Sequence, residues 1–177
     1  KNIIPLSEPL ISGNEWKYVK DCLDTGWVSS AGKYVNQFEK MTADYVGTKY
    51  AVAVVNGTAA LHLSLIVAGV QPGDEVIVPA LTFIAPVNVV RYCMAEPVFM
   101  DCNPDTLCMD VQKVSDFLNK GCREGWDGYL YNKKSKRRIK AIIPVHIFGH
   151  PADMDALLKI CKESNIDIIE DATESLG

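Results

Sequence analysis

The sequence predicts an α/β fold built on a largely parallel β-sheet, and two observations point to this class. From residue 50 onward, short β-branched runs bounded by turn residues alternate with segments of helical periodicity. The short runs are almost continuously apolar, which is typical of strands that helices cover on both faces. A β-α-β-α-β succession implies parallel strands joined by crossover helices. The predicted strands are Tyr50–Val55, Glu75–Pro79, Pro97–Asp101, Ile139–His146 and Ile166–Glu170.

Helices are predicted in the segments between these strands. Leu61, Leu65 and Ala68, for example, recur at the spacing of one helical face. Turn residues such as Pro72-Gly73-Asp74 separate helices from strands. The predicted helices are Thr58–Ala68, Ile84–Cys93, Val111–Lys120 and Met154–Ser164.

The first 49 residues follow a different pattern and predict an N-terminal helical segment before the α/β part over residues 50–177. Gly13–Asp24 and Tyr34–Val46 are expected to be two amphipathic helices. The loop of residues 25–32 between them carries two glycines, three hydroxyl side chains and Trp27. This composition fits a plain connection as well as a loop that meets a ligand or partner.

Composition excludes several classes of protein. The chain has 177 residues, with 22 acidic and 18 basic residues and a net charge of −4, which argues against nucleic acid or an anionic membrane as the main partner. No apolar run approaches the roughly 20 residues of a membrane helix. The six cysteines form no C-x-x-C pair and no zinc-type cluster, so we expect reduced thiols in a cytoplasmic protein without a metal site. The basic stretch within Gly121–Lys140 predicts a solvated surface hairpin.

Ligands of open α/β sheets bind beyond the carboxyl ends of the strands, so the residues at these ends are the candidate site. Asn56-Gly57-Thr58 follows the first predicted strand and opens a helix, where free backbone N–H groups favour an anion such as phosphate. The segment is neither G-x-G-x-x-G nor a Walker motif, which weakens dinucleotide and nucleotide-triphosphate hypotheses. A helix start capped by Asn56 or Thr58 explains the same residues without a ligand.

Three further strand ends carry candidate residues. Phe83 follows the second strand, where its ring either covers a planar ligand or belongs to the core. His146 and His150 follow the fourth strand, but the turn residues between them argue against a metal. Glu170 and Asp171 end an apolar strand, which predicts a buried acid that needs a cation or a proton donor. A structural ion pair and a protonated heterocyclic nitrogen both satisfy that need.

These features converge on one cofactor. An anion-binding turn, an aromatic ring and a carboxylate at one sheet edge match the phosphate, the ring and the pyridinium nitrogen of pyridoxal 5'-phosphate (PLP). An acid beside that nitrogen keeps it protonated and maintains the ring as an electron sink.

Five motifs in order resemble the sugar aminotransferases of the DegT/DnrJ/EryC1/StrS family, and within it the enzymes that aminate nucleotide-linked 4-keto-6-deoxy sugars. The resemblance covers essentially the whole chain. The motifs are Gly26-Trp27-Val28-Ser29-Ser30, Asn56-Gly57-Thr58-Ala59-Ala60-Leu61, Pro79-Ala80-Leu81-Thr82-Phe83, Pro144-Val145-His146-Ile147-Phe148-Gly149-His150-Pro151 and Glu170-Asp171-Ala172-Thr173-Glu174-Ser175-Leu176-Gly177.

The resemblance implies the large domain of fold-type I PLP enzymes and a role for individual residues. Gly57 and Thr58 would hold the cofactor phosphate, Phe83 would stack on the ring, and Asp171 would pair with the pyridine nitrogen. Glu174 stands where the family often has Gln or His, close to the ring hydroxyl, and would assist catalysis there. Trp27, Ser29 and His146 would lie on the side of the sugar nucleotide.

The family's Schiff-base lysine belongs to a segment C-terminal to the Glu-Asp-Ala motif, and no lysine of this chain fits its motif. We therefore expect the chain to be part of a longer homodimeric aminotransferase with a further small C-terminal domain, and to be inactive alone. The expected partners are a nucleotide-diphosphate sugar and an amino donor, by family likeness glutamate. Three alternatives stay open: a sugar dehydratase of the same family that uses pyridoxamine phosphate, a non-catalytic binding module, and a nucleotide-binding α/β domain without PLP.

Overall fold

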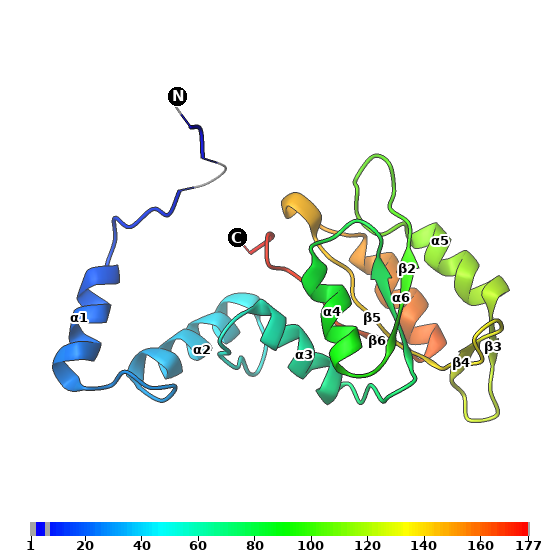
Figure 1. The fold of residues 1–177 in the computed structure, drawn as a ribbon, viewed down its shortest axis with the longest axis horizontal. Coiled ribbons are helices and arrows are strands. Elements are labelled where there is room, and N and C mark those ends of the chain that lie inside the picture. Colours follow the sequence, from blue (N-terminus) through cyan, green and yellow to red (C-terminus); the bar gives the residue numbers. More distant parts are fainter. Residues whose placement is uncertain (1–2, 6–7, 177) are drawn as a thin grey trace. The chain divides into compact units, whose positions relative to one another are not determined.

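A computed structural model describes residues 3–5 and 8–176, and the chain divides into two compact units, residues 1–53 and residues 54–177 (Figure 1). The first unit contains helices α1 (Glu15–Thr25) and α2 (Lys33–Val46). Both predicted helices are confirmed within two residues at each end. Each ends at a glycine in the left-handed conformation, Gly26 with φ 74° and Gly47 with φ 71°.

The second unit is built on a four-stranded sheet in the order β2-β1-β5-β6. All three pairings are parallel, which confirms the predicted α/β class. The strands are β1 (Glu75–Pro79), β2 (Glu96–Met100), β5 (Ile139–Ile142) and β6 (Asp167–Ile168).

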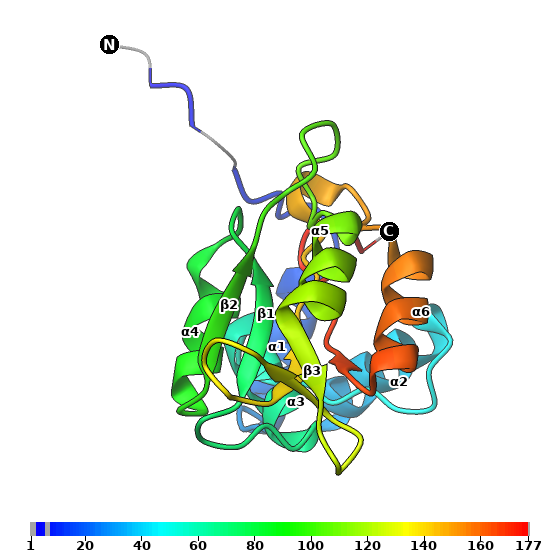
Figure 2. The same ribbon diagram turned by 90° about the vertical axis from the view of Figure 1, so that its right-hand side faces the viewer.

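Helices cover both faces of this sheet, so there is one hydrophobic core on each face. Successive side chains of β1 project alternately into the two cores. Val76 and Val78 pack in one cluster, which also contains residues of α3 and α4, while Ile77 packs in a second cluster with residues of α5 and α6. Figure 2 shows α4 and the pair α5 and α6 on opposite sides of β1 and β2. This double coverage explains why the strand residues are continuously apolar. The helices are α3 (Gly57–Val67), α4 (Ile84–Tyr92), α5 (Val111–Asp116) and α6 (Met154–Ser164).

The predicted strand Tyr50–Val55 is wrong: residues 50–55 form no regular secondary structure. Val55 is 88% exposed, and the Ala53 N–H donates to the Glu39 carboxylate at 2.8 Å instead of to a strand. Among the described residues no segment pairs with this backbone. An apolar β-branched run favours extended structure, but only a neighbouring strand can satisfy its N–H and C=O groups.

The segment between β2 and β5 is more divided than the sequence predicts. The expected helix Val111–Lys120 splits into α5 and a π-helical turn, Phe117–Gly121. The predicted surface hairpin is confirmed as the antiparallel pair β3 (Cys122–Glu124) and β4 (Leu130–Asn132). Within the described part of the chain, no helix has the length and apolar character that a membrane span requires.

The cysteines differ in environment, and this predicts their reactivity. Burial raises the pKa of Cys122 to about 11 and that of Cys161 to about 12, while Cys22 and Cys102 are only partly buried. Because the thiolate is the nucleophile, Cys161 and Cys122 should react with iodoacetamide at pH 8 at least about a hundredfold more slowly than Cys102. Peptide mass spectrometry over time measures these rates. In denaturant all six thiols should react alike, and a Cys161 that reacts as fast as Cys102 under native conditions would contradict the prediction.

Candidate functional site

A cavity of about 530 Å³ opens at the carboxyl ends of β1, β5 and β6, as the sheet topology predicts. Residues from four separate segments line it: the start of α3, the turn after β1, the segment after β5 and the segment after β6. It therefore brings together every predicted site residue of the second unit. These are Gly57, Thr58, Phe83, His146, Asp171 and Glu174.

The start of α3 presents two free donors to this cavity. Asn56 caps the helix, since its Oδ1 accepts from the Ala59 N–H at 2.8 Å and its carbonyl oxygen accepts from the Ala60 N–H at 3.1 Å. The N–H groups of Gly57 and Thr58 have no acceptor among the described residues. Uncompensated N–H groups at the positive end of a helix favour an anion.

The cap gives a prediction with a matched control. Asn56→Ala should lower the free energy of unfolding by about 1 kcal/mol, because the Ala59 N–H loses its acceptor. Asn56→Asp keeps a carboxyl oxygen in the same place and should retain stability. Its negative charge beside Gly57 and Thr58 should nevertheless weaken anion binding. Urea unfolding and phosphate titration measure the two effects, and equal stability of the Ala variant and the wild type would rule out a stabilising cap.

Asp171 lines the same cavity, and one of its carboxylate oxygens already accepts hydrogen bonds. Its Oδ1 accepts from the Thr173 N–H at 3.2 Å and from the Thr173 hydroxyl at 2.6 Å, while Oδ2 has no partner among the described residues. The backbone of Asp171 is held on both sides, since its N–H donates to Pro144 O at 2.9 Å and its O accepts from the His146 N–H at 3.1 Å. One oxygen thus remains for a donor in the cavity.

The prediction of a buried acid at this strand end is wrong. Asp171 is only partly buried, and the Glu170 side chain is 49% exposed. Ile169 is the last buried residue of this strand segment, and Asp171, two residues further on, lines the cavity. Glu170 meets the imidazole of His146 rather than an Arg or Lys.

His146 is 4% exposed, and both of its ring nitrogens are used within the protein. Nδ1 accepts from the Ala152 N–H at 3.0 Å, and Nε2 lies 2.6 Å from Glu170 Oε1. Since Nδ1 is the acceptor, the neighbours assign the proton to Nε2, which donates to the carboxylate. A hydrogen bond from the imidazole to a ligand would therefore replace one of these two bonds.

Glu174 holds the turn after β5. Its Oε2 accepts from the Phe148 N–H at 2.7 Å. In the same turn, Gly149 has φ 78°, and a Cβ there would lie 3.1 Å from the Glu174 carbonyl oxygen, so this position requires glycine. The close approach keeps the segments after β5 and β6 together at the cavity wall.

Phe83 is 77% exposed at the cavity, as a ring that covers a ligand would be, and not part of the core. Its neighbour Thr82, to which the motif Pro79-Ala80-Leu81-Thr82-Phe83 assigns no role, lines the same cavity. The Thr82 hydroxyl oxygen is buried without a hydrogen-bond partner among the described residues. Such an atom is costly unless a ligand or water meets it. The signal in the sequence is its place in that motif, in the turn after a strand.

Trp27 and Ser29 belong to the first unit, where they line a separate cavity of about 280 Å³. Asp21 and Lys33 also line it, and their charged groups lie 2.6 Å apart. This contact lowers the pKa of Asp21 and raises that of Lys33. Among the described residues of both units, no group of three or more His, Cys, Asp or Glu side chains could hold a metal ion.

With this fold and cavity the chain belongs to the DegT/DnrJ/EryC1/StrS aminotransferase family, whose profile matches residues 9–177. The resemblance drawn from the five motifs is thereby confirmed. Among its relatives, GDP-perosamine synthase from Caulobacter vibrioides is 44% identical over 174 residues, which are 98% of this chain and 42% of the relative.

Solved structures agree with this assignment and confirm the fold of PLP-dependent aminotransferases. A DegT/DnrJ/EryC1/StrS aminotransferase from Brucella abortus matches with a TM-score of 0.79 and 33% identity, over 90% of this chain and 40% of that one. GDP-4-keto-6-deoxy-D-mannose-3-dehydratase from E. coli, solved with hydrated PLP, matches with a TM-score of 0.80 and 27% identity. The match covers 98% of this chain and 41% of the dehydratase chain. The chain spans about two fifths of the length of the relatives that it matches.

Proposed function

We propose that this chain forms the cofactor-binding part of a PLP-dependent aminotransferase that transfers an amino group from glutamate to a nucleotide-linked 4-keto-6-deoxy sugar. The observation that carries the proposal is the cavity at the carboxyl edge of the sheet, whose lining holds two N–H groups and one carboxylate oxygen that have no partner among the described residues. The similarity to a GDP-perosamine synthase supports GDP as the nucleotide.

The residues fit the cofactor group by group. The N–H groups of Gly57 and Thr58 would bind its phosphate, and Phe83 would cover its ring. Asp171 Oδ2 would accept from the pyridine nitrogen. The orphaned hydroxyl of Thr82 offers a further hydrogen bond in the same cavity. When bound, PLP withdraws electrons from the carbon next to the transferred nitrogen.

The protein side chains then hold protons and exclude water. Asp171 keeps the proton on the pyridine nitrogen, and Phe83 shields one face of the ring from solvent. Glu174 has one oxygen on the Phe148 N–H, which leaves the other for the ring hydroxyl. Trp27 and Ser29 are assigned to the sugar nucleotide, whereas His146, expected there too, has both ring nitrogens bonded within the protein. We assign proton transfer at carbon to a lysine in the part of the relatives that this chain does not span, so the 177 residues should bind cofactor without turnover.

A binding experiment on this chain tests the proposal. Equilibrium dialysis should show saturable binding of one PLP per chain, and inorganic phosphate should compete with PLP for the site. Failure to bind PLP contradicts the proposal, and binding of GTP in its place would favour a plain nucleotide-binding domain. We further propose that the protein containing this chain acts as a cytoplasmic homodimer, which sedimentation velocity tests. The free cysteines fit a reducing compartment.

A second candidate is sugar dehydration with the pyridoxamine form of the cofactor, because a dehydratase structure matches this chain over 98% of its residues. Glutamate labelled with ¹⁵N separates the two in the protein that contains this chain. An aminotransferase leaves the label in the sugar product. A dehydratase releases a sugar that has lost water and carries no label.

A further inference from the structure

His146 forms three hydrogen bonds, one through its backbone N–H and one through each ring nitrogen. Its backbone N–H donates to the carbonyl oxygen of Asp171, its Nδ1 accepts from the Ala152 N–H, and its Nε2–H donates to Glu170. The imidazole is nearly inaccessible to solvent, whereas the Glu170 side chain is half exposed. A buried, fully hydrogen-bonded imidazole has a fixed orientation.

These contacts lie where the sheet continues toward the cavity. β5 and β6 pair through Ile142 and Ile168, and the isolated bridge between Val145 and Asp171 keeps the same register. Beyond this bridge the chain has no strand partner among the described residues, and the following residues 173 and 174 are exposed. The hydrogen bond between His146 and Glu170 is a side-chain contact between the same two segments, directly next to Asp171, and the bond from the Phe148 N–H to Glu174 is another one further along.

We propose that His146 and Glu170 form a positioning pair that fixes the direction of the Asp171 carboxylate toward the pyridine nitrogen, an inference that rests on the proposed function. Neither residue touches the nitrogen. Glu170 lies directly before Asp171, so any twist of the backbone between them turns the Asp171 carboxylate. A group that must meet one nitrogen has to be held to within about 0.5 Å, and packed neighbours provide this.

Glu170 is the residue to change first, because an exposed carboxylate can be replaced without opening the core. Glu170→Ala removes the acceptor of the His146 Nε2–H, whereas Glu170→Gln keeps an oxygen that can accept it. Glu163→Ala, an exposed glutamate of α6 without an ion pair among the described residues, is the matched control. We expect PLP to bind the Ala variant about tenfold more weakly, and the Gln and control variants like the wild type.

A second ligand separates positioning from a general loss of structure. The PLP analogue with C–H in place of the pyridine nitrogen cannot use Asp171, so Glu170→Ala should leave its affinity unchanged. Equal weakening of PLP and of the analogue would overturn the inference, because it would show a distorted cavity. Unchanged affinity of the Ala variant for PLP would overturn it as well. Failure of the wild-type chain to bind PLP would instead refute the proposed function.

The two bonds of the imidazole can be tested apart. Asn has its side-chain oxygen near the place of Nδ1, and Gln has its amide nitrogen near the place of Nε2. His146→Gln should therefore retain more of the PLP affinity than His146→Asn, since it keeps a donor to Glu170. Circular dichroism of bound PLP reports the ring orientation in each variant. The reverse order of affinity would overturn the role of Glu170.

Discussion

Asp171→Ala should weaken PLP binding by about a hundredfold, the largest functional effect that we expect from one substitution. Asp171 Oδ2 is free, while Oδ1 is held by Thr173, so the carboxylate is prepared for one charged donor. A hydrogen bond between charged groups contributes up to about 3 kcal/mol, which corresponds to roughly a hundredfold in affinity. Equilibrium dialysis of PLP against the variant and the wild type measures the ratio.

Asp171→Asn separates charge from shape. The amide retains the contacts of Thr173 with an oxygen but cannot hold the proton on the pyridine nitrogen. We expect an affinity between those of the Ala variant and the wild type. Asp167→Ala is the control, because Asp167 pairs with Lys140 in the same sheet but does not line the cavity. If Asp171→Ala binds PLP like the wild type, Asp171 is not the partner of the nitrogen.

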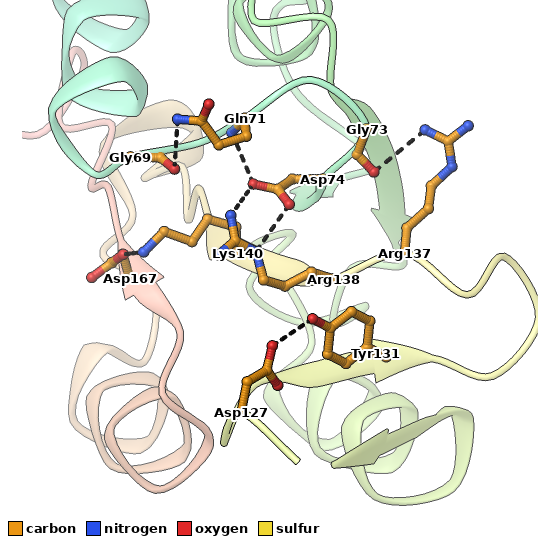
Figure 3. Close-up of polar contacts among 10 residues, drawn as sticks. All are labelled: Gly69, Gln71, Gly73, Asp74, Asp127, Tyr131, Arg137, Arg138, Lys140 and Asp167. Carbon is orange, nitrogen blue, oxygen red and sulfur yellow. Dashed lines mark hydrogen bonds and ion pairs between the residues drawn. The ribbon is translucent and has the colours of Figure 1, made fainter. Parts of the chain in front are cut away.

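Asp74→Ala should lower the free energy of unfolding of the second unit by about 3 kcal/mol. Asp74 and Arg138 precede β1 and β5, and they form a two-pronged ion pair with distances of 2.9 and 2.5 Å (Figure 3). The Asp74 side chain is 9% exposed and that of Arg138 is 21% exposed. Removal of one partner leaves a partly buried guanidinium and the Gln71 N–H without their acceptor. Removing one partner of a buried ion pair lowers the free energy of unfolding by about 3 to 5 kcal/mol. Because Arg138 is partly exposed, we expect a loss near the lower end of that range.

Urea unfolding measures this loss. The double variant Asp74→Ala/Arg138→Ala should lose less than the sum of the two single variants, because it leaves no unpaired charge. Lys120→Ala removes an exposed pair with Asp116 and should change stability by no more than about 0.5 kcal/mol. Equal effects of Asp74→Ala and Lys120→Ala would show that burial adds nothing to the Asp74–Arg138 pair.

Local patterns predicted much of the candidate site. The cap at Asn56, the turn that carries Phe83 and the two acids after the last strand each belong to one short segment, and parallel topology brings their ends to one edge. The hydroxyl of Thr82 was not found in this way, since its significance comes from being buried without a partner.

Local sequence was enough to establish the α/β class, the positions of most helices and strands, and the edge of the sheet where a ligand would bind. These follow from periodicity and turn residues, which act over a few neighbours. Three-dimensional packing was needed to show that residues 50–55 do not form a strand and that Asp171 is only partly buried. It was also needed to show that Glu170 and Ala152 occupy both ring nitrogens of His146. Pairing, burial and hydrogen bonding depend on segments far apart in the chain, and no local pattern encodes which of them meet.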